Sequence, residues 1–442
     1  MDPGLSRRAQ KTLKELLPAF ATGRHASQHS DKPDNSTIDL SSALNEVIHP
    51  ELLEFLKSTV EEHVTSEALA SRSASLHGGN TVLREALASF FNTYFQPIHT
   101  VKPEHIVLTT GASDAIENVI HAVCDDGDSV LVPGPHWPGF TTLLQRKVNI
   151  TPIIAQPPTY SHWDNYLVPS LQAAYDFSDQ KARIKAVLLC NPNTPLSRCY
   201  PRKTMLELME FCQERGLHLI CDEVYALTGL ATKEQDGADA DAKAKSTPAP
   251  AEEFVSALSL TEPLVPEGAV KVDPSRVHVV WSASGVFGLG GLKIGCLITQ
   301  QNPTLHTLLA LSTTPPSTLS TLYLTHLLTW PYLPTLLALA RERLSTSYHL
   351  LASFLRAAHI DFVPPTHGLV LFAKLGAGVR GAEQEAAFFE DLGARGGVRV
   401  AQGRWFREGE KEFGWCRVRF SVEERVMGVA VARLGKFLES RG

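Results

Sequence analysis

Two hydrophobic patterns alternate along the chain as far as about residue 325. Short runs that are apolar at nearly every position have the length of buried strands: HIVLTT (105–110), SVLVP (129–133), KAVLLCNP (185–192), LHLICDE (217–223), RVHVVWS (276–282) and GCLITQ (295–300). Amphipathic segments with helical spacing, such as residues 202–216, lie between them. Apolar strands that alternate with helices predict an α/β fold with a mostly parallel sheet covered on both faces.

The pattern changes after about residue 325. A long helix is predicted over about 334–358, and three shorter strand-like pieces follow it: LVLFAK (369–374), VRVAQG (398–403) and CRVRFSV (416–422). We therefore predict a second, smaller α+β domain. Residues 231–251 are nearly all small, charged or proline, which predicts a flexible insertion.

Composition and charge narrow the classes of function. The chain has 442 residues, a net charge of −6 and 43% hydrophobic residues. These values are typical of a soluble globular protein with room for a large and a small domain. No surplus of basic residues is available to neutralise a phosphate backbone, so nucleic acid is not expected as a partner.

The cysteines and the apolar stretches indicate the cellular compartment in which the protein is expected. The seven cysteines include no CxxC pair, which predicts reduced thiols in the cytoplasm and no metal site. The most apolar region, 307–340, is interrupted by prolines, and the N-terminal segment has no apolar core. Neither a membrane span nor a signal peptide is therefore expected.

Residues suited to ligand binding follow the predicted strands, where such folds bind their ligands. Gly111, Ala112 and Ser113 lie between HIVLTT and a predicted helix that runs to about Val123. A helix N-terminus offers free N–H groups and a positive dipole end to an anion, and glycine allows a close approach. On its own, a glycine at this place is more often a turn residue.

Three further loops carry candidates. Trp137 lies between two prolines and could stack on a planar ring, or serve as a packing residue. Asp222 and Tyr225 follow LHLIC, where a carboxylate could pair with a protonated ring nitrogen and a phenol could reach a ring oxygen. A structural carboxylate is the alternative. Ser282 and Ser284 begin a glycine-rich segment whose hydroxyls suit a phosphate, unless it is a bare turn.

In their order along the chain, these motifs resemble fold type I pyridoxal-phosphate (PLP) enzymes of aminotransferase class I/II. The branch that contains 1-aminocyclopropane-1-carboxylate synthase and its fungal relatives is the most similar. The resemblance runs from about Asn45 to Phe437 through LHGGNTVLREALASFF (76–91), IVLTTGAS (106–113), VLVPGPHWPGF (130–140), LLCNPNTPLSRCY (188–200), HLICDEVY (218–225), VHVVWSASGVFGLGGLKIG (277–295) and GWCRVRF (414–420).

The resemblance implies an architecture. A seven-stranded, mostly parallel sheet would form a large domain over 60–324, and 325–442 would form the small domain. Residues 1–59 would supply an N-terminal arm and part of the small domain. Sites in this family are completed across a dimer, so a homodimer is expected.

The resemblance also implies a role for each candidate. Ten residues would bind PLP: Gly111, Ala112, Ser113, Trp137, Thr194, Asp222, Tyr225, Ser282, Ser284 and Lys293. Among them, Trp137 matches the residue that stacks on the ring, Asp222 the carboxylate at the ring nitrogen, and Tyr225 the phenol at the 3-oxygen. Arg417 matches the arginine whose planar fork grips an amino acid's α-carboxylate, and Asn45 would line the substrate side.

This sequence departs from the family at four positions. Where the family has the lysine that bonds PLP covalently and moves the proton at Cα, this chain has Gly285. Thr194 replaces an asparagine at the ring's 3-oxygen, and Lys293 replaces an arginine at the phosphate. His77 aligns with a tyrosine that reaches the neighbouring subunit. An engineered Lys→Gly substitution would leave the surrounding motif intact. Because several neighbouring positions differ together, natural divergence is favoured.

With the lysine absent, Tyr225 and His77 are the remaining catalytic candidates, and His136 is another potential base. Ordinary transamination is not expected. Three hypotheses stay open. The chain could bind PLP or a PLP adduct without a covalent bond and act on an amino-acid-derived metabolite, by analogy in specialised metabolism. It could be a PLP-independent enzyme that uses the cavity for acid–base or cyclisation chemistry. It could also be a non-catalytic partner of an active paralogue.

Overall fold

The fold was analysed in a computed structural model of the chain. It describes residues 37–66, 78–159, 163–231, 253–260, 272–406 and 412–441, together with Ser6, Ala9, Gln10 and Lys14. His77 and the predicted insertion, apart from Ala231, lie outside the described residues. None of the helices in the described ranges is long and apolar enough to cross a membrane.

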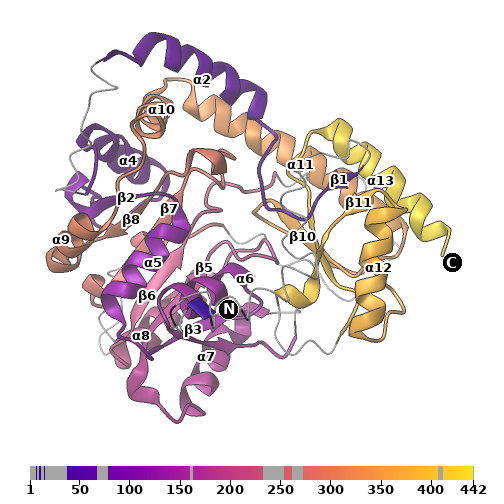
Figure 1. The fold of residues 1–442 in the computed structure, drawn as a ribbon, viewed down its shortest axis with the longest axis horizontal. Coiled ribbons are helices and arrows are strands. Elements are labelled where there is room, and N and C mark those ends of the chain that lie inside the picture. Colours follow the sequence, from indigo (N-terminus) through magenta and orange to yellow (C-terminus); the bar gives the residue numbers. More distant parts are fainter. Residues whose placement is uncertain are drawn as a thin grey trace.

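A seven-stranded sheet forms the centre of the larger lobe (Figure 1). Its strands are β2 (Ile106–Thr109), β3 (Ser129–Pro133), β4 (Thr151–Ala155), β5 (Ile184–Cys190), β6 (His218–Asp222), β7 (Val277–Ser282) and β8 (Gly295–Thr299). They pair in the order β2-β8-β7-β6-β5-β3-β4, and only β8 runs antiparallel to its neighbours. The predicted α/β fold with a mostly parallel seven-stranded sheet is confirmed.

Both faces of this sheet are covered by helices, because alternate strand residues point to opposite sides. Val130 and Val132 belong to one apolar cluster, whereas Leu131 belongs to the other. The first cluster includes residues of α5 (Ala112–Val123), α6 (Pro138–Thr142) and α9 (Pro303–Ser312). The second includes residues of α4 (Thr81–Tyr94), α7 (Leu167–Asp176), α8 (Arg202–Glu214) and α10 (Thr318–Thr329).

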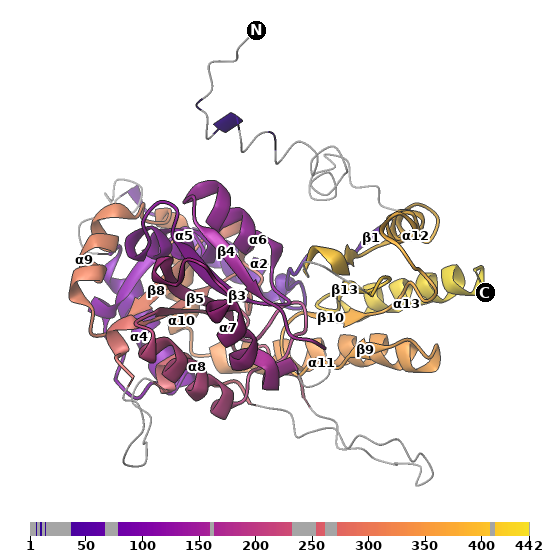
Figure 2. The ribbon, with the colours of Figure 1, turned by 90° about the horizontal axis from the view of Figure 1, so that it is seen from below.

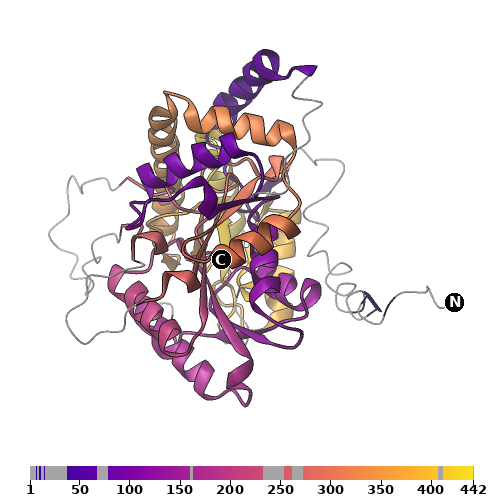
Figure 3. The same cartoon turned by 90° about the vertical axis from the view of Figure 1, so that its left-hand side faces the viewer.

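The C-terminal part forms a smaller lobe beside the large sheet (Figure 2). Its antiparallel sheet has the order β12-β13-β10-β9 and consists of β9 (Phe362–Val363), β10 (Val370–Ala373), β12 (Ala401–Gln402) and β13 (Cys416–Arg419). The helices are α11 (Leu333–Ala357), α12 (Ala382–Ala394) and α13 (Glu424–Glu439). Seen from the large lobe, these C-terminal elements lie behind it (Figure 3).

The N-terminal segment joins the two lobes. β1 (Ile38–Asp39) pairs in parallel with β11 (Val398–Arg399), and α2 (His49–His63) contacts α10. An apolar cluster continues from the second face of the large sheet into the smaller lobe. The proposed domain borders after residues 59 and 324 stay a prediction.

A histidine pair lies at the amino end of β6, away from the strand ends that carry the candidate site; His278 is buried and His218 is half-buried. His218 Nδ1 lies 2.9 Å from His278 Nε2, and His278 Nδ1 lies 3.0 Å from the Thr299 hydroxyl. Burial lowers the pKa of His218 to about 4 and that of His278 to about 3. Both side chains are therefore neutral in the folded protein at neutral pH.

This pair predicts a loss of stability in acid. An unfolded histidine has a pKa near 6.5, so the unfolded chain takes up protons first as the pH falls. The contribution of the neutral histidines to folding stability is fully present above about pH 6.5 and declines as the pH falls towards about 4. In His218→Gln, the fall in unfolding midpoint between pH 7.5 and 5 should be smaller than in wild type. His121→Gln, at an exposed position on α5, should behave like wild type, and equal pH dependence of all three proteins would contradict the prediction.

Candidate functional site

A cavity of about 220 Å³ lies at the carboxyl ends of the central strands. It is formed where the loops after β2, β3, β5, β6 and β7 meet, because parallel strands all end at the same edge of the sheet. All ten residues predicted to bind PLP line it: Gly111, Ala112, Ser113, Trp137, Thr194, Asp222, Tyr225, Ser282, Ser284 and Lys293. The structure therefore brings together residues that are far apart in the sequence.

One side of the cavity is built to receive an anion. Gly111 precedes α5 with φ 104°, a conformation that favours glycine, and a side chain there would meet nothing within 4 Å. The first N–H groups of this 12-residue helix have no acceptor within the helix. The hydroxyls of Ser282 and Ser284, 2.6 Å apart, line the same cavity. Among the described residues, no carboxylate pairs with Lys293.

The other side carries a buried carboxylate. Asp222 ends β6 with only 5% of its surface exposed, and its Oδ1 accepts a 3.3 Å hydrogen bond from the Val224 N–H. Burial raises the pKa of Asp222 to about 7, and the hydrogen bond from Val224 opposes that rise. No cation of the described residues pairs with it. Such a group is poised to accept a positively charged ring nitrogen.

Two hydroxyl groups, from Tyr225 and Thr194, also line the cavity. Burial raises the pKa of Tyr225, so its phenol stays protonated, although the positive charge of Arg417 opposes the rise. The Thr194 hydroxyl lies near enough to Tyr225 to lower that pKa slightly, yet it is buried with no partner at hydrogen-bond distance among the described residues. A buried hydroxyl without a partner is unfavourable unless a ligand supplies one.

Arg417 does not line the cavity but lies near it on β13. Its Nη2 donates a 2.6 Å hydrogen bond to the Ser41 carbonyl, and its guanidinium stacks 4.6 Å above the Phe406 ring. The Nε atom is buried without a partner among the described residues. Burial lowers the pKa of Arg417 to about 10, which leaves it charged at neutral pH. Its Nε–H is therefore a donor without an acceptor among the described residues.

Asn45 and His136 also lie outside the cavity lining. Asn45 is fully buried, and its side-chain amide donates a 2.7 Å hydrogen bond to the Val286 carbonyl. His136 is buried, its Nε2 lies 3.3 Å from the Thr141 hydroxyl, and burial lowers its pKa to about 4. Roles for these side chains toward a substrate stay predictions.

The structure adds residues that we did not single out from the sequence. Cys190, the last residue of β5, lines the cavity and pairs across the sheet with Asp222. Its place at the end of a predicted strand could have identified it from the sequence, because ligands bind at the carboxyl ends of parallel strands. Phe406 also matters, since its carbonyl accepts a 3.0 Å hydrogen bond from the His136 N–H while its ring contacts Arg417. No local sequence signal marks that long-range contact.

Comparison with known proteins identifies the family. The family described as "Aminotransferase class I and II" matches residues 48–434. The chain belongs to this family. It is 33% identical over 433 residues to the "Probable aminotransferase aclI" of Aspergillus oryzae, with 98% of this chain and 97% of that protein covered. It is also 26% identical over 372 residues to "1-aminocyclopropane-1-carboxylate synthase 7" of Arabidopsis thaliana, covering 83% and 77% of the two chains.

A solved structure supports the fold assignment. A single mutant of Thermus thermophilus aspartate aminotransferase superposes with a TM-score of 0.71 at 22% identity, covering 98% of this chain and 99% of that one. The predicted fold type I architecture and the resemblance to class I/II aminotransferases are therefore confirmed. The chain is an aminotransferase-like protein related to fungal probable aminotransferases and to 1-aminocyclopropane-1-carboxylate synthases.

PLP is the cofactor of this family. The lining residues suit non-covalent binding of PLP but not its covalent attachment. The anion-binding turn, the unpaired Asp222 carboxylate and the partnerless Thr194 hydroxyl match its phosphate, ring nitrogen and ring oxygen. The covalent attachment does not fit, because Gly285 has no amine and does not line the cavity. Lys293 is the only lysine in the lining formed by the described residues.

The unpaired carboxylate predicts a destabilised cofactor-free protein. The pKa of Asp222, raised to about 7 from an ordinary value near 3.9, gives stability that is present below about pH 4 and lost as the pH rises through 7. Asp222→Asn cannot ionise and keeps the acceptor for Val224. It should therefore stabilise the cofactor-free protein at pH 8 by about 1–3 kcal/mol, and by less at pH 5.

Chemical unfolding at the two pH values measures this difference. Asp126→Asn, at an exposed position, should match wild type at both. A loss of stability in Asp222→Asn at pH 8 would show that the carboxylate has a structural role instead.

Proposed function

We propose that this chain is a diverged class I/II aminotransferase-like protein that binds PLP without a covalent bond. It would act on an amino acid or an amino-acid-derived metabolite, in specialised metabolism. The observation that carries the proposal is Asp222, a buried carboxylate that faces the cavity without a cation. A chain that had abandoned the cofactor would have no evident need to keep an unpaired charge there.

The residues of the cavity suggest how PLP would be held. The N–H groups at the start of α5, the Ser282 and Ser284 hydroxyls and the Lys293 ammonium would bind its phosphate. Trp137 would cover one face of the ring, and Asp222 would pair with its protonated nitrogen. When bound, PLP supplies an electron sink for chemistry at an amino acid's Cα.

Three side chains would act on the rest of the ligand. The Tyr225 phenol, kept protonated by burial, would donate a hydrogen bond to the ring's 3-oxygen. Thr194 would share that oxygen and so gain the partner that its hydroxyl lacks. Arg417, with an unused Nε–H, would bind the α-carboxylate of an amino-acid-like molecule.

The absence of an amine at Gly285 limits the chemistry. No side chain at that position could move a proton at Cα, so ordinary transamination is not part of the proposal. Tyr225, Asp222, Cys190 and Lys293 are the titrating side chains in the described lining. Asp222, Tyr225 and Lys293 each hold part of PLP in this proposal, so a proton transferred by any of them would alter that contact.

We also propose a cytoplasmic homodimer. Solved structures of the same fold include aspartate aminotransferase. Enzymes of this fold complete their active sites across a dimer. Three large apolar side chains on neighbouring parts of the large lobe are more than half exposed, which suits an interface: Val82 on α4, Leu311 on α9 and Leu319 on α10.

Absorbance titration with PLP and with pyridoxamine phosphate tests the central proposal. Wild type should bind both with dissociation constants below about 1 mM, and Asp222→Asn should bind at least about tenfold more weakly, since it loses a charge-assisted hydrogen bond. Dialysis should remove the cofactor, and borohydride should not fix it to the chain. No binding by wild type would refute the proposal and favour a PLP-independent enzyme or a non-catalytic partner protein.

A second prediction concerns Phe406. Phosphopyridoxyl-L-alanine carries an α-carboxylate that pyridoxamine phosphate lacks, so their affinities separate the contribution of Arg417. Because Phe406 stacks on that guanidinium, Phe406→Leu should weaken binding of the first ligand by roughly 3- to 30-fold. Binding of the second should not change. Equal losses for both ligands in calorimetry would contradict a selective role at the carboxylate.

A further inference from the structure

The position of the missing lysine is closed by backbone. A Cβ atom added to Gly285 would lie 1.8 Å from the carbonyl oxygen of Val224 and 2.8 Å from its carbonyl carbon. Real Cβ atoms essentially never approach another atom within 3.0 Å, so the two loops would have to separate by more than 1 Å. The obstacle is backbone and not the flexible end of a side chain. A hydrogen atom on Cα therefore takes this place and points at the oxygen, as in a weak C–H···O contact.

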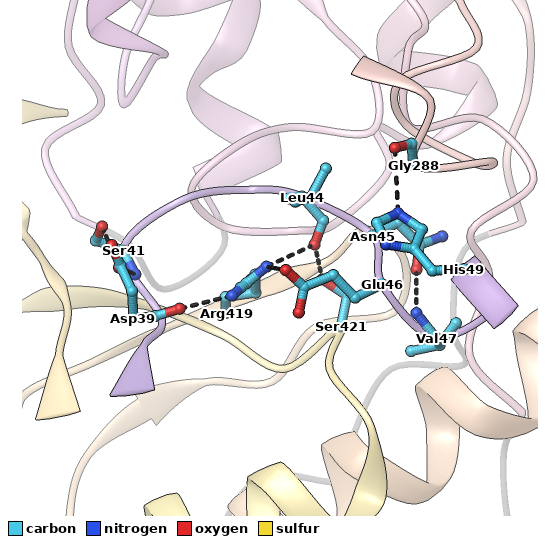
Figure 4. A network of polar contacts seen from close by, with 10 residues as sticks. All are labelled: Asp39, Ser41, Leu44, Asn45, Glu46, Val47, His49, Gly288, Arg419 and Ser421. Atoms are coloured by element: carbon cyan, nitrogen blue, oxygen red, sulfur yellow. Dashed lines mark hydrogen bonds and ion pairs between the residues drawn. The ribbon is translucent and has the colours of Figure 1, made fainter. Parts of the chain in front are cut away.

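A second glycine fixes the same loop from another side. Gly288 has φ 68°, and a Cβ there would lie 1.9 Å from the Asn45 carbonyl oxygen. The Asn45 amide donates to the Val286 carbonyl. His49 Nε2 lies 3.3 Å from the Gly288 carbonyl (Figure 4). The loop 285–288 is thus enclosed between the loop after β6 and the segment 39–49.

Segment 39–49 is itself anchored to the smaller lobe (Figure 4). Arg419 of β13 pairs with Glu46 at 2.9 Å and donates a 2.6 Å hydrogen bond to the Asp39 carbonyl. The Ser421 hydroxyl donates a 2.7 Å hydrogen bond to the Leu44 carbonyl. The loop that carries Gly285 therefore cannot recede from Val224 without disturbing these contacts.

We propose that Gly285 is a positioning residue, whose backbone contact with Val224 sets the Asp222–Tyr225 segment and excludes any side chain, including an anchoring lysine. This inference rests on the proposed function for the identity of the ligand. It goes further, because it explains the absence of the lysine by the close packing of backbone around Gly285. Val224 lies between Asp222, whose Oδ1 it caps, and Tyr225, so displacing its carbonyl displaces both ring contacts.

Gly285→Ala is the most direct test, with Gly291→Ala as a matched control in the same loop. At Gly291 an added Cβ would meet nothing within 4 Å. Gly285→Ala should lower the unfolding midpoint by several degrees and weaken pyridoxamine phosphate binding by about 10- to 100-fold, because a shift of about 1 Å misplaces the ring contacts. Inorganic phosphate, which needs only the anion-binding side, should bind as in wild type. Gly291→Ala should match wild type in all three measurements.

The outcomes separate this inference from the proposed function. Unchanged stability and unchanged pyridoxamine phosphate binding in Gly285→Ala would overturn the inference, and equal losses for both ligands would reject selective positioning. If wild type binds no PLP, the proposed function fails, and the midpoints of the two alanine variants still test the contact.

Gly285→Lys extends the test to the chemistry. Borohydride treatment with PLP, followed by peptide mass spectrometry, should find no cofactor attached at position 285, and the unfolding midpoint should again be lowered. A cofactor attached at that position in a protein as stable as wild type would overturn the exclusion.

Discussion

The burial of Asp222 at the end of β6 is the constraint on which the site depends. The carboxylate is almost fully enclosed, and the hydrogen bond that it accepts from the Val224 N–H does not compensate for lost hydration, so its pKa rises to about 7. The cavity beside it is lined by a helix N-terminus, two serine hydroxyls and the Thr194 hydroxyl, which has no partner in the part of the chain that the structure describes. A ligand that brought a cation to Asp222 and an anion to α5 would satisfy these groups.

Backbone contacts keep that arrangement in place and explain why it cannot be converted into the usual covalent site by one substitution. Gly285 faces the Val224 carbonyl and Gly288 faces the Asn45 carbonyl, so the loop after β7 has no room for side chains at either point. Segment 39–49 then transfers this constraint to β13 through Arg419. The same strand carries Arg417, so both lobes contribute to one set of contacts around the cavity.

Much of the fold and the cavity could be predicted from the sequence, because buried parallel strands are continuous apolar runs and bring the residues that follow them to one edge. β4 was missed, since it is a half-exposed edge strand that contains Pro152. The single strand expected over 398–403 is two, because Val398 pairs with Ile38 while Ala401 pairs with Arg417. Pairings of such long range leave no local pattern. Nor does a glycine in a sequence indicate what its missing side chain would meet.

A crystal structure of the protein grown with PLP tests directly whether the cavity binds PLP without a covalent bond. We expect a ring between Trp137 and Asp222, a phosphate at residues 111–113, and no continuous electron density from the cofactor to any lysine. An empty cavity at saturating PLP, or density that joins the cofactor to Lys293, would contradict it.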